Sequence, residues 1–282
     1  MKGEKRRGFW SAHRYKLPAA PYILWMSLFV VIPIVLIVVY AFTNSGGAFT
    51  LDNFKHMSDY TLVFVRSISL AFVATVICLL IGYPVSYVLS KSGPMVQRVA
   101  MMAVMLPMWI NFLLRTYAWM SILENTGLLN RLLGLIGLPA VSIINTQGAV
   151  ILGMVYNYLP FMILPIYSVI VKIDRSVIEA AQDLGADSAR VFLRVILPLS
   201  LSGVISGVTM VFVPSVSTFI ISKLLGGGTN MLLGDLIEMQ FLGSAYNPHL
   251  GSAISLIMMV IVVICMTIMN RFGEGEEQAV MF

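Results

Sequence analysis

The sequence predicts an all-α integral membrane protein with six transmembrane helices. Hydrophobic residues make up 59% of the chain and charged residues only 11%, whereas soluble domains carry about 25% charged residues. The mean hydropathy is +0.90. A run of about 20 apolar residues crosses a bilayer. We expect spans near 21–43, 63–89, 99–120, 148–171, 200–222 and 250–270.

These spans define a transmembrane domain over residues 21–270, between an N-terminal tail (1–20) and a C-terminal tail (271–282). The third span is the least regular, because Pro107, Asn111 and Arg115 interrupt it. Prolines in or beside other spans predict bent helices; they are Pro33, Pro84, Pro160, Pro165 and Pro214. Gly203 and Gly207 form a small-xxx-small pair, which predicts close helix contact. We find no internal repeat, which disfavours a self-contained carrier made of two inverted halves.

The distribution of basic residues predicts the orientation. Most of the 18 Lys and Arg residues lie in the N-terminal tail, in two alternate loops and at the C-terminal end. Because basic residues favour the cytoplasmic side, we expect both termini and the loop 172–198 in the cytoplasm. The tail is expected to be retained and to lie against the membrane surface. The net charge of +5 then reflects topology, and no nucleic-acid motif accompanies it.

The loop 172–198 differs from the rest of the chain because its sequence is typical of short amphipathic helices outside the bilayer. Ser176 and Glu179 have the spacing of a capping box, which predicts a helix starting near Ser176. Gly185 predicts a break, and Pro198 the end of a second helix. Ala180 and Ala181 offer a face with small side chains, which allows close approach of another surface.

The same loop contains Glu179-Ala180-Ala181, Gly185 after three residues, and Leu197-Pro198 further on, with Val195 in place of an isoleucine. This pattern resembles the coupling loop of permease subunits in ATP-binding-cassette (ABC) importers. The resemblance implies a type I importer permease fold and a loop that docks on a separate ATPase subunit. It implies that Glu179, Ala180, Ala181, Gly185, Leu197 and Pro198 form this contact. The alternative is an ordinary interfacial helix.

Three further segments, 106–119, 153–168 and 219–242, resemble spermidine/putrescine importer permeases, most closely the B-type subunit. This resemblance implies a multi-pass protein of the bacterial cytoplasmic membrane that carries a polyamine by alternating access. It also implies three kinds of protein partner: ABC ATPase subunits, a second homologous permease and an extracytoplasmic substrate-binding protein. Permeases for iron, sulfate or molybdate share the coupling loop, so that loop alone fixes no substrate.

A polyamine is a flexible chain of ammonium groups, and an aromatic face attracts an ammonium group by about 0.5–2 kcal/mol. Candidate path residues are therefore Trp109, Asn111, Tyr117, Trp119, Tyr156, Asn157 and Tyr158. Asp235 and Glu238, in an outer loop, could attract a cation to the entrance. For each residue the alternative is an aromatic-belt anchor or a solvated loop charge. Arg115 does not suit a cation path, and we expect it to pair with an acid such as Glu124 or with phosphate headgroups.

Enzyme, metal and cofactor sites are not indicated. The three histidines lie outside the predicted spans and are not spaced at i,i+4; they are His13, His56 and His249. The glycine-rich residues 226–230 lack the lysine of a phosphate-binding loop, and both cysteines lie inside apolar spans. We therefore expect no nucleotide site, metal or cofactor, with ATP hydrolysis left to the partner. A stand-alone channel or secondary carrier and a membrane-embedded enzyme are the other hypotheses.

Overall fold

The computed structural model describes residues 20–228, 230–243 and 245–279. The N-terminal tail predicted to lie on the membrane is almost wholly outside the described residues. The described residues are helical apart from loops and one isolated bridge between Thr43 and Phe49. The elements of the described chain are α2 (Ala20–Met26), η2 (Ser27–Val31), α3 (Ile32–Ala41), α4 (Asp52–Lys55), η3 (His56–Tyr60), α5 (Thr61–Lys91), α6 (Pro94–Trp109), α7 (Phe112–Leu123), α8 (Leu128–Leu135), α9 (Gln147–Ile170), α10 (Arg175–Asp183), α11 (Ser188–Val191), η4 (Phe192–Ile196), α12 (Leu197–Leu199), α13 (Leu201–Ser217), α14 (Ile220–Leu225), α15 (Leu233–Leu242) and α16 (Pro248–Ala279).

Four helices in the described residues are long and apolar enough to cross a membrane: Pro21–Ala41, Asp52–Lys91, Gln147–Ile170 and Pro248–Met269. Two bent pairs bring the number to six if each pair is one span. This all-α arrangement of apolar helices confirms the predicted fold class. The boundaries of the transmembrane domain at residues 21 and 270 remain predictions.

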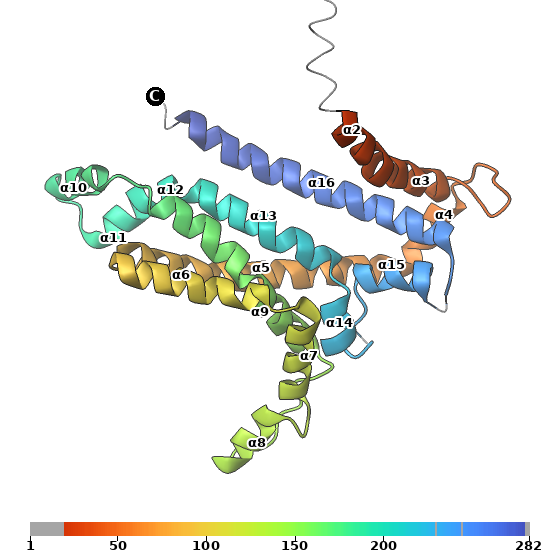
Figure 1. The fold of residues 1–282 in the computed structure, drawn as a ribbon, viewed down its shortest axis with the longest axis horizontal. Coiled ribbons are helices and arrows are strands. Elements are labelled where there is room, and N and C mark those ends of the chain that lie inside the picture. Colours follow the sequence, from red (N-terminus) through yellow and green to blue (C-terminus); the bar gives the residue numbers. More distant parts are fainter. Residues whose placement is uncertain (1–19, 229, 244, 280–282) are drawn as a thin grey trace, which may run out of the picture.

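The third predicted span, residues 99–120, is not one straight helix. The chain turns by 92° between Pro94–Trp109 and Phe112–Leu135. Asn111 begins the new helix, because its side-chain oxygen accepts a hydrogen bond from the Leu113 N–H at 2.8 Å. A side chain that caps a helix at this point favours a break over a continuous helix. Figure 1 shows α7 and α8 extending sideways from the long helices.

The bundle is built around α5, α9 and α13, which lie side by side and form its main core (Figure 1). Hydrogen bonds join these helices near one end. The Tyr83 hydroxyl of α5 lies 2.8 Å from the Ser200 hydroxyl, beside α13. The Ser86 hydroxyl donates to the Ile163 carbonyl of α9 at 3.1 Å. Polar side chains inside a bilayer need such partners, so these bonds fix the relative positions of the three helices.

The predicted close contact at Gly203 and Gly207 is present between α13 and α9. A Cβ atom on Gly203 would lie 3.0 Å from the Pro165 carbonyl oxygen and 3.1 Å from the Ile166 Cα. A Cβ atom on Gly207 would lie 2.9 Å from the Met162 sulfur. The two backbones therefore approach each other at a place where no larger side chain fits.

The loop between α9 and α13 folds into two short helices, but its caps differ from the prediction. The predicted Ser176–Glu179 capping box is wrong: α10 begins at Arg175, and the Asp174 carboxylate accepts from the Ser176 N–H at 3.0 Å. Asp174 and Ser176 are both good capping residues, and the aspartate takes the position. Gly185 has φ +83°, so the predicted break lies at a left-handed residue that favours glycine.

The second helix ends at Leu199, one residue after the predicted end at Pro198. The π-helical turn η4 precedes the proline, and α12 continues through it to Leu199. The chain then bends by 61° between Ser188–Leu199 and Leu201–Ser217. Proline lacks an N–H, and a local π adjustment before it allows the helix to pass through the residue.

Gly203→Ala should destabilise the protein by about 1–3 kcal/mol, because the added methyl group meets the backbone of α9. Gly134→Ala in α8 is the matched control, since nothing lies within 4 Å of a Cβ added there. Thermal unfolding in detergent, followed by labelling of the buried Cys78 in a Cys265→Ser background, measures the difference. Equal midpoints for the two variants would show that the α9–α13 contact is looser than described.

Asp174→Ala should destabilise the first turn of α10 by about 1 kcal/mol and speed amide hydrogen exchange there roughly fivefold. Asp174→Asn should keep the cap. The hydrogen bond from the Ser176 N–H lowers the pKa of the Asp174 carboxyl from its ordinary 3.8. The cap is therefore present above pH 3.8 and is lost as the pH falls through the lowered pKa. Hydrogen exchange with mass spectrometry checks this, and unchanged exchange in Asp174→Ala would contradict it.

Candidate coupling surface and substrate path

The candidate coupling residues lie at one end of the bundle, on the α10–α11 hairpin (residues 175–191) and the helix that follows it (Figure 1). Glu179, Ala180 and Gly185 are exposed on the hairpin. Leu197 is half-buried against the main core, and Pro198 is exposed beside it. The hairpin thus joins the end of α9 to the helix that leads into α13.

Ala180 and Ala181 do not share one outward face. Ala181 is half-buried and packs with Ile178 against the main core of this chain. The side of α10 that adjoins this packed side carries Val177 and Ala180, and Leu184, directly after the helix ends at Asp183, continues the same side at i, i+3, i+7 spacing. We call these three residues the outer face of α10. Leu184 is 89% exposed.

Sequence reasoning missed Leu184, although the signal was present: a large apolar residue directly before the glycine break of a hydrophilic loop. Together with the exposed Val177 it makes this part of the loop surface apolar. The outer face of α10 is therefore apolar and free to contact another surface.

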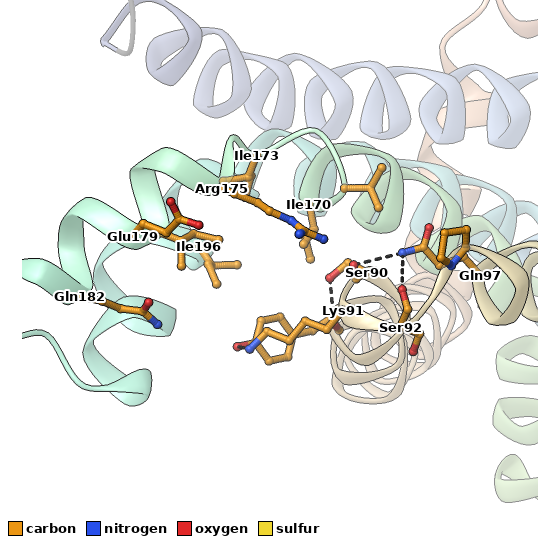
Figure 2. A pocket seen from close by; sticks show the side chains of 14 residues that line it. Ser90, Lys91, Ser92, Gln97, Ile170, Ile173, Arg175, Glu179, Gln182 and Ile196 are labelled. Carbon is orange, nitrogen blue, oxygen red and sulfur yellow. Dashed lines mark hydrogen bonds between the residues drawn. The ribbon is translucent and has the colours of Figure 1, made fainter.

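A cavity of about 550 Å³ separates α10 from the turn between α5 and α6. Arg175 of α10 and Lys91 at the end of α5 enter it from different walls (Figure 2). Gln97 fixes the turn: its amide donates to the Ser90 and Ser92 carbonyls at 3.2 and 2.9 Å. Helix α10 is therefore packed to the bundle through Ile178 and Ala181, with open space toward α5 and α6.

Only some of the candidate path residues come together. Trp119 of α7 and Tyr156 of α9 form a T-shaped pair with ring centroids 5.2 Å apart. Trp109, which is 88% exposed, and Tyr117, which is 47% exposed, lie on the surface of this chain. Asn111 is engaged in capping α7.

Asn157 and Tyr158 are buried in α9. The Asn157 amide donates to the Gly153 carbonyl at 2.9 Å, while its oxygen Oδ1 is buried with no hydrogen-bond partner. The Tyr158 hydroxyl lies 3.5 Å from the Pro214 carbonyl oxygen of α13. Asn157 therefore has one oxygen acceptor that receives no hydrogen bond. It directly follows Tyr156 of the aromatic pair in the sequence.

The two candidate entrance acids are engaged within the chain. Glu238 forms an ion pair with Lys223, with N–O distances of 2.7 and 2.9 Å. Both acids lie in α15 and not in a loop: Oδ2 of Asp235 accepts from the Leu232 N–H at 2.8 Å and caps this helix, its Oδ1 is buried without a hydrogen-bond partner, and burial raises the pKa of this carboxyl. Both interactions reduce the attraction of these acids for a passing cation.

No group of three or more His, Cys, Asp and Glu side chains within the described ranges is placed to hold a metal ion.

The chain is similar to known transport proteins over most of its length. Residues 80–274 match the family of binding-protein-dependent transport system inner membrane components. The spermidine/putrescine transport system permease protein PotB of Haemophilus influenzae is 39% identical over 270 residues, covering 92% of this chain and 94% of that protein. PotB of Escherichia coli is 38% identical over 248 residues, covering 84% of this chain and 90% of that protein.

Solved structures share the fold. A chain of a bacterial ABC transporter for the acidic polysaccharide alginate aligns with TM-score 0.76 at 18% identity, covering 96% of this chain and 97% of that one. A chain of the MetNI methionine ABC transporter aligns with TM-score 0.60 at 19% identity, covering 79% of this chain and 98% of that one. These findings confirm the importer permease fold and the resemblance described above. The chain belongs to the family of binding-protein-dependent transport system inner membrane components, the permease subunits of ABC importers.

Proposed function

We propose that this chain is one permease subunit of a polyamine importer and that it carries spermidine or putrescine by alternating access. The substrate assignment rests on 39% identity, over 92% of the chain, to a permease named for spermidine and putrescine transport. Membership of the permease family makes the chain a transport component of the cytoplasmic membrane.

The candidate path supports a cationic substrate. The Trp119–Tyr156 pair offers aromatic faces at the junction of α7 and α9, and each can attract an ammonium group by about 0.5–2 kcal/mol. The buried Asn157 oxygen is an acceptor without a donor. Because Glu238 is paired with Lys223 and Asp235 caps α15 through one oxygen, aromatic and amide groups would hold the cation, and weak holding favours its release.

The outer face of α10 is the proposed contact for a separate ATPase subunit, which hydrolyses the ATP. Its apolar residues Val177, Ala180 and Leu184 would enter a groove on that subunit, while Glu179 at the edge would meet a basic side chain. Movement of the α10–α11 hairpin would act on α9 and α13, the two helices it joins. In this arrangement the hairpin and both termini are cytoplasmic.

The remaining partners are a second homologous permease, a second ATPase subunit and an extracytoplasmic binding protein. One structural relative, the alginate transporter, is solved in complex with a periplasmic protein that holds its ligand. The structures with TM-scores of 0.76 and 0.60 are chains of ABC transporters. The proposed assembly therefore has two permeases in the bilayer, ATPases on the α10 side and the binding protein on the opposite side.

The substrate assignment predicts which solute stimulates ATP hydrolysis by the reconstituted importer. With its binding protein present, spermidine or putrescine should stimulate hydrolysis several-fold, whereas sulfate, molybdate and ferric iron should not. Stimulation by one of those ions alone would overturn the polyamine assignment and leave the importer fold intact. Substrate uptake by vesicles that contain no ATPase would instead indicate a stand-alone channel or carrier.

Gly185→Val should leave the protein in the membrane but reduce substrate uptake per ATP hydrolysed. Gly185 has φ +83° and nothing lies within 4 Å of an added Cβ, so the variant meets backbone strain of about 1–2 kcal/mol and no clash. Gly47→Val is the matched control, because Gly47 has φ +76° and equally open surroundings in the loop before α4. Uptake per ATP should be normal in Gly47→Val, and a normal ratio in Gly185→Val would contradict the coupling role of the hairpin.

A further inference from the structure

Arg115 of α7 has a buried charge that this chain does not compensate. The residue is half-buried: its Nε and Nη1 atoms are enclosed by this chain without a hydrogen-bond acceptor, and only Nη2 is left within reach of a group from outside the chain. The Phe112 ring centroid lies 5.9 Å from its Cζ. An aromatic ring supplies no full negative charge.

The predicted pairing of Arg115 with an acid of this chain such as Glu124 is wrong, whereas its pairing with phosphate headgroups stays a prediction. In the part of the chain that the structure describes, the ion pairs join Lys55 with Asp52 and Lys223 with Glu238. A charge that is enclosed without a partner destabilises the protein. Because a guanidinium group stays protonated at any physiological pH, it cannot relieve this cost by losing its proton. A counter-charge from outside the chain is the remaining way to relieve it.

The position of Arg115 along the bundle limits where that counter-charge comes from. Helix α6 starts beside α10, since Pro94 and Glu179 line the same cavity. It has 16 residues and is therefore about 24 Å long, less than the roughly 30 Å of a bilayer core. The chain then turns by 92° into α7. Arg115, four residues beyond Asn111, thus lies within the depth of the bilayer.

We call residues 112–135, which form α7 and α8, the lateral arm. It extends sideways from the bundle (Figure 1) and packs chiefly against α9 and α14. Its surface includes Leu114, which is 64% exposed. Residues 124–127, between α7 and α8, are not helical.

We propose that the second permease covers the lateral arm and supplies a carboxylate that pairs with Arg115. This inference rests on the proposed two-permease assembly. A carboxylate accepts a charge-assisted hydrogen bond from a guanidinium N–H, here that of Nη2, which makes an aspartate or glutamate the best complement. An ATPase would contact α10, at the start of α6, and a binding protein would lie outside the bilayer. The cationic substrate would be repelled by Arg115, so it cannot provide the counter-charge.

The location is tested by photo-crosslinking in the co-expressed, complete importer. A photoreactive amino acid at Leu114 should capture the second permease, whereas one at Val177 should capture the ATPase. Capture of only lipid, the binding protein or the ATPase from Leu114 would overturn the proposal. If Leu114 captures the second permease but Val177 does not capture the ATPase, the coupling surface is contradicted and the contact with the second permease stands. The experiment therefore tests the two proposals separately.

The charge pair is tested by reversal. Arg115→Glu should reduce co-purification of the second permease by at least about tenfold, since it places two acids together in a buried site. Arg131→Glu is the matched control on the same arm, because Arg131 is exposed and donates only to the Thr126 carbonyl at 3.1 Å. It should leave the complex intact.

Rescue separates pairing from misfolding. Changing each membrane-embedded acid of the second permease to arginine, one at a time, should identify one change that restores assembly with Arg115→Glu. Arg115→Met, which removes the uncompensated charge and keeps an apolar stem, should raise the thermal midpoint of the isolated chain. Normal assembly of Arg115→Glu, or rescue by none of the partner's acids, would overturn the proposal.

Discussion

Helices α9 and α13 are in close contact at Gly203. A Cβ atom added to this glycine would lie only 3.0 Å from the Pro165 carbonyl oxygen. The α10–α11 hairpin lies between the ends of these two helices. A bilayer offers no hydrophobic force between helices, so such packing and the Tyr83–Ser200 and Ser86–Ile163 hydrogen bonds set their positions. Because the contact leaves no free space, a displacement of the hairpin moves both helices together and is not absorbed by loose packing.

Helix α9 links the two candidate sites. Its end leads into the hairpin, and Tyr156 in the same helix meets Trp119 of the lateral arm. Pro160 and Pro165 lie between Tyr156 and the hairpin, where each removes one backbone hydrogen bond from the helix. Movement at the hairpin can therefore reach the aromatic pair through a single helix that is able to bend. This geometry gives the proposed alternating access a physical route.

Much of the fold could be predicted because it follows from composition and backbone rules: apolar runs of spanning length, a small-residue pair, and a glycine at a helix break. The 92° turn at Ile110 and Asn111 was not predictable from hydropathy, since residues 99–120 are apolar on both sides of the break. It depends on one capping side chain. The α10 cap was misplaced because Asp174 and Ser176 are both suitable and lie two residues apart.

For the candidate sites, sequence spacing alone could not show which face of α10 turns inward, so Ala181 was grouped with Ala180. The Lys223–Glu238 ion pair joins α14 to α15 across a loop and depends on the fold.

The central claim is that the outer face of α10 faces the cytoplasm and is covered by a separate ATPase. Labelling of Leu184→Cys by a membrane-impermeant maleimide, in a Cys265→Ser background, tests it most directly, since Leu184 is 89% exposed in this chain. The label should react in inside-out vesicles stripped of ATPase, fail to react in right-side-out vesicles, and be blocked when ATPase subunits are restored. Reaction from the outside, or no protection by the ATPase, would contradict the account.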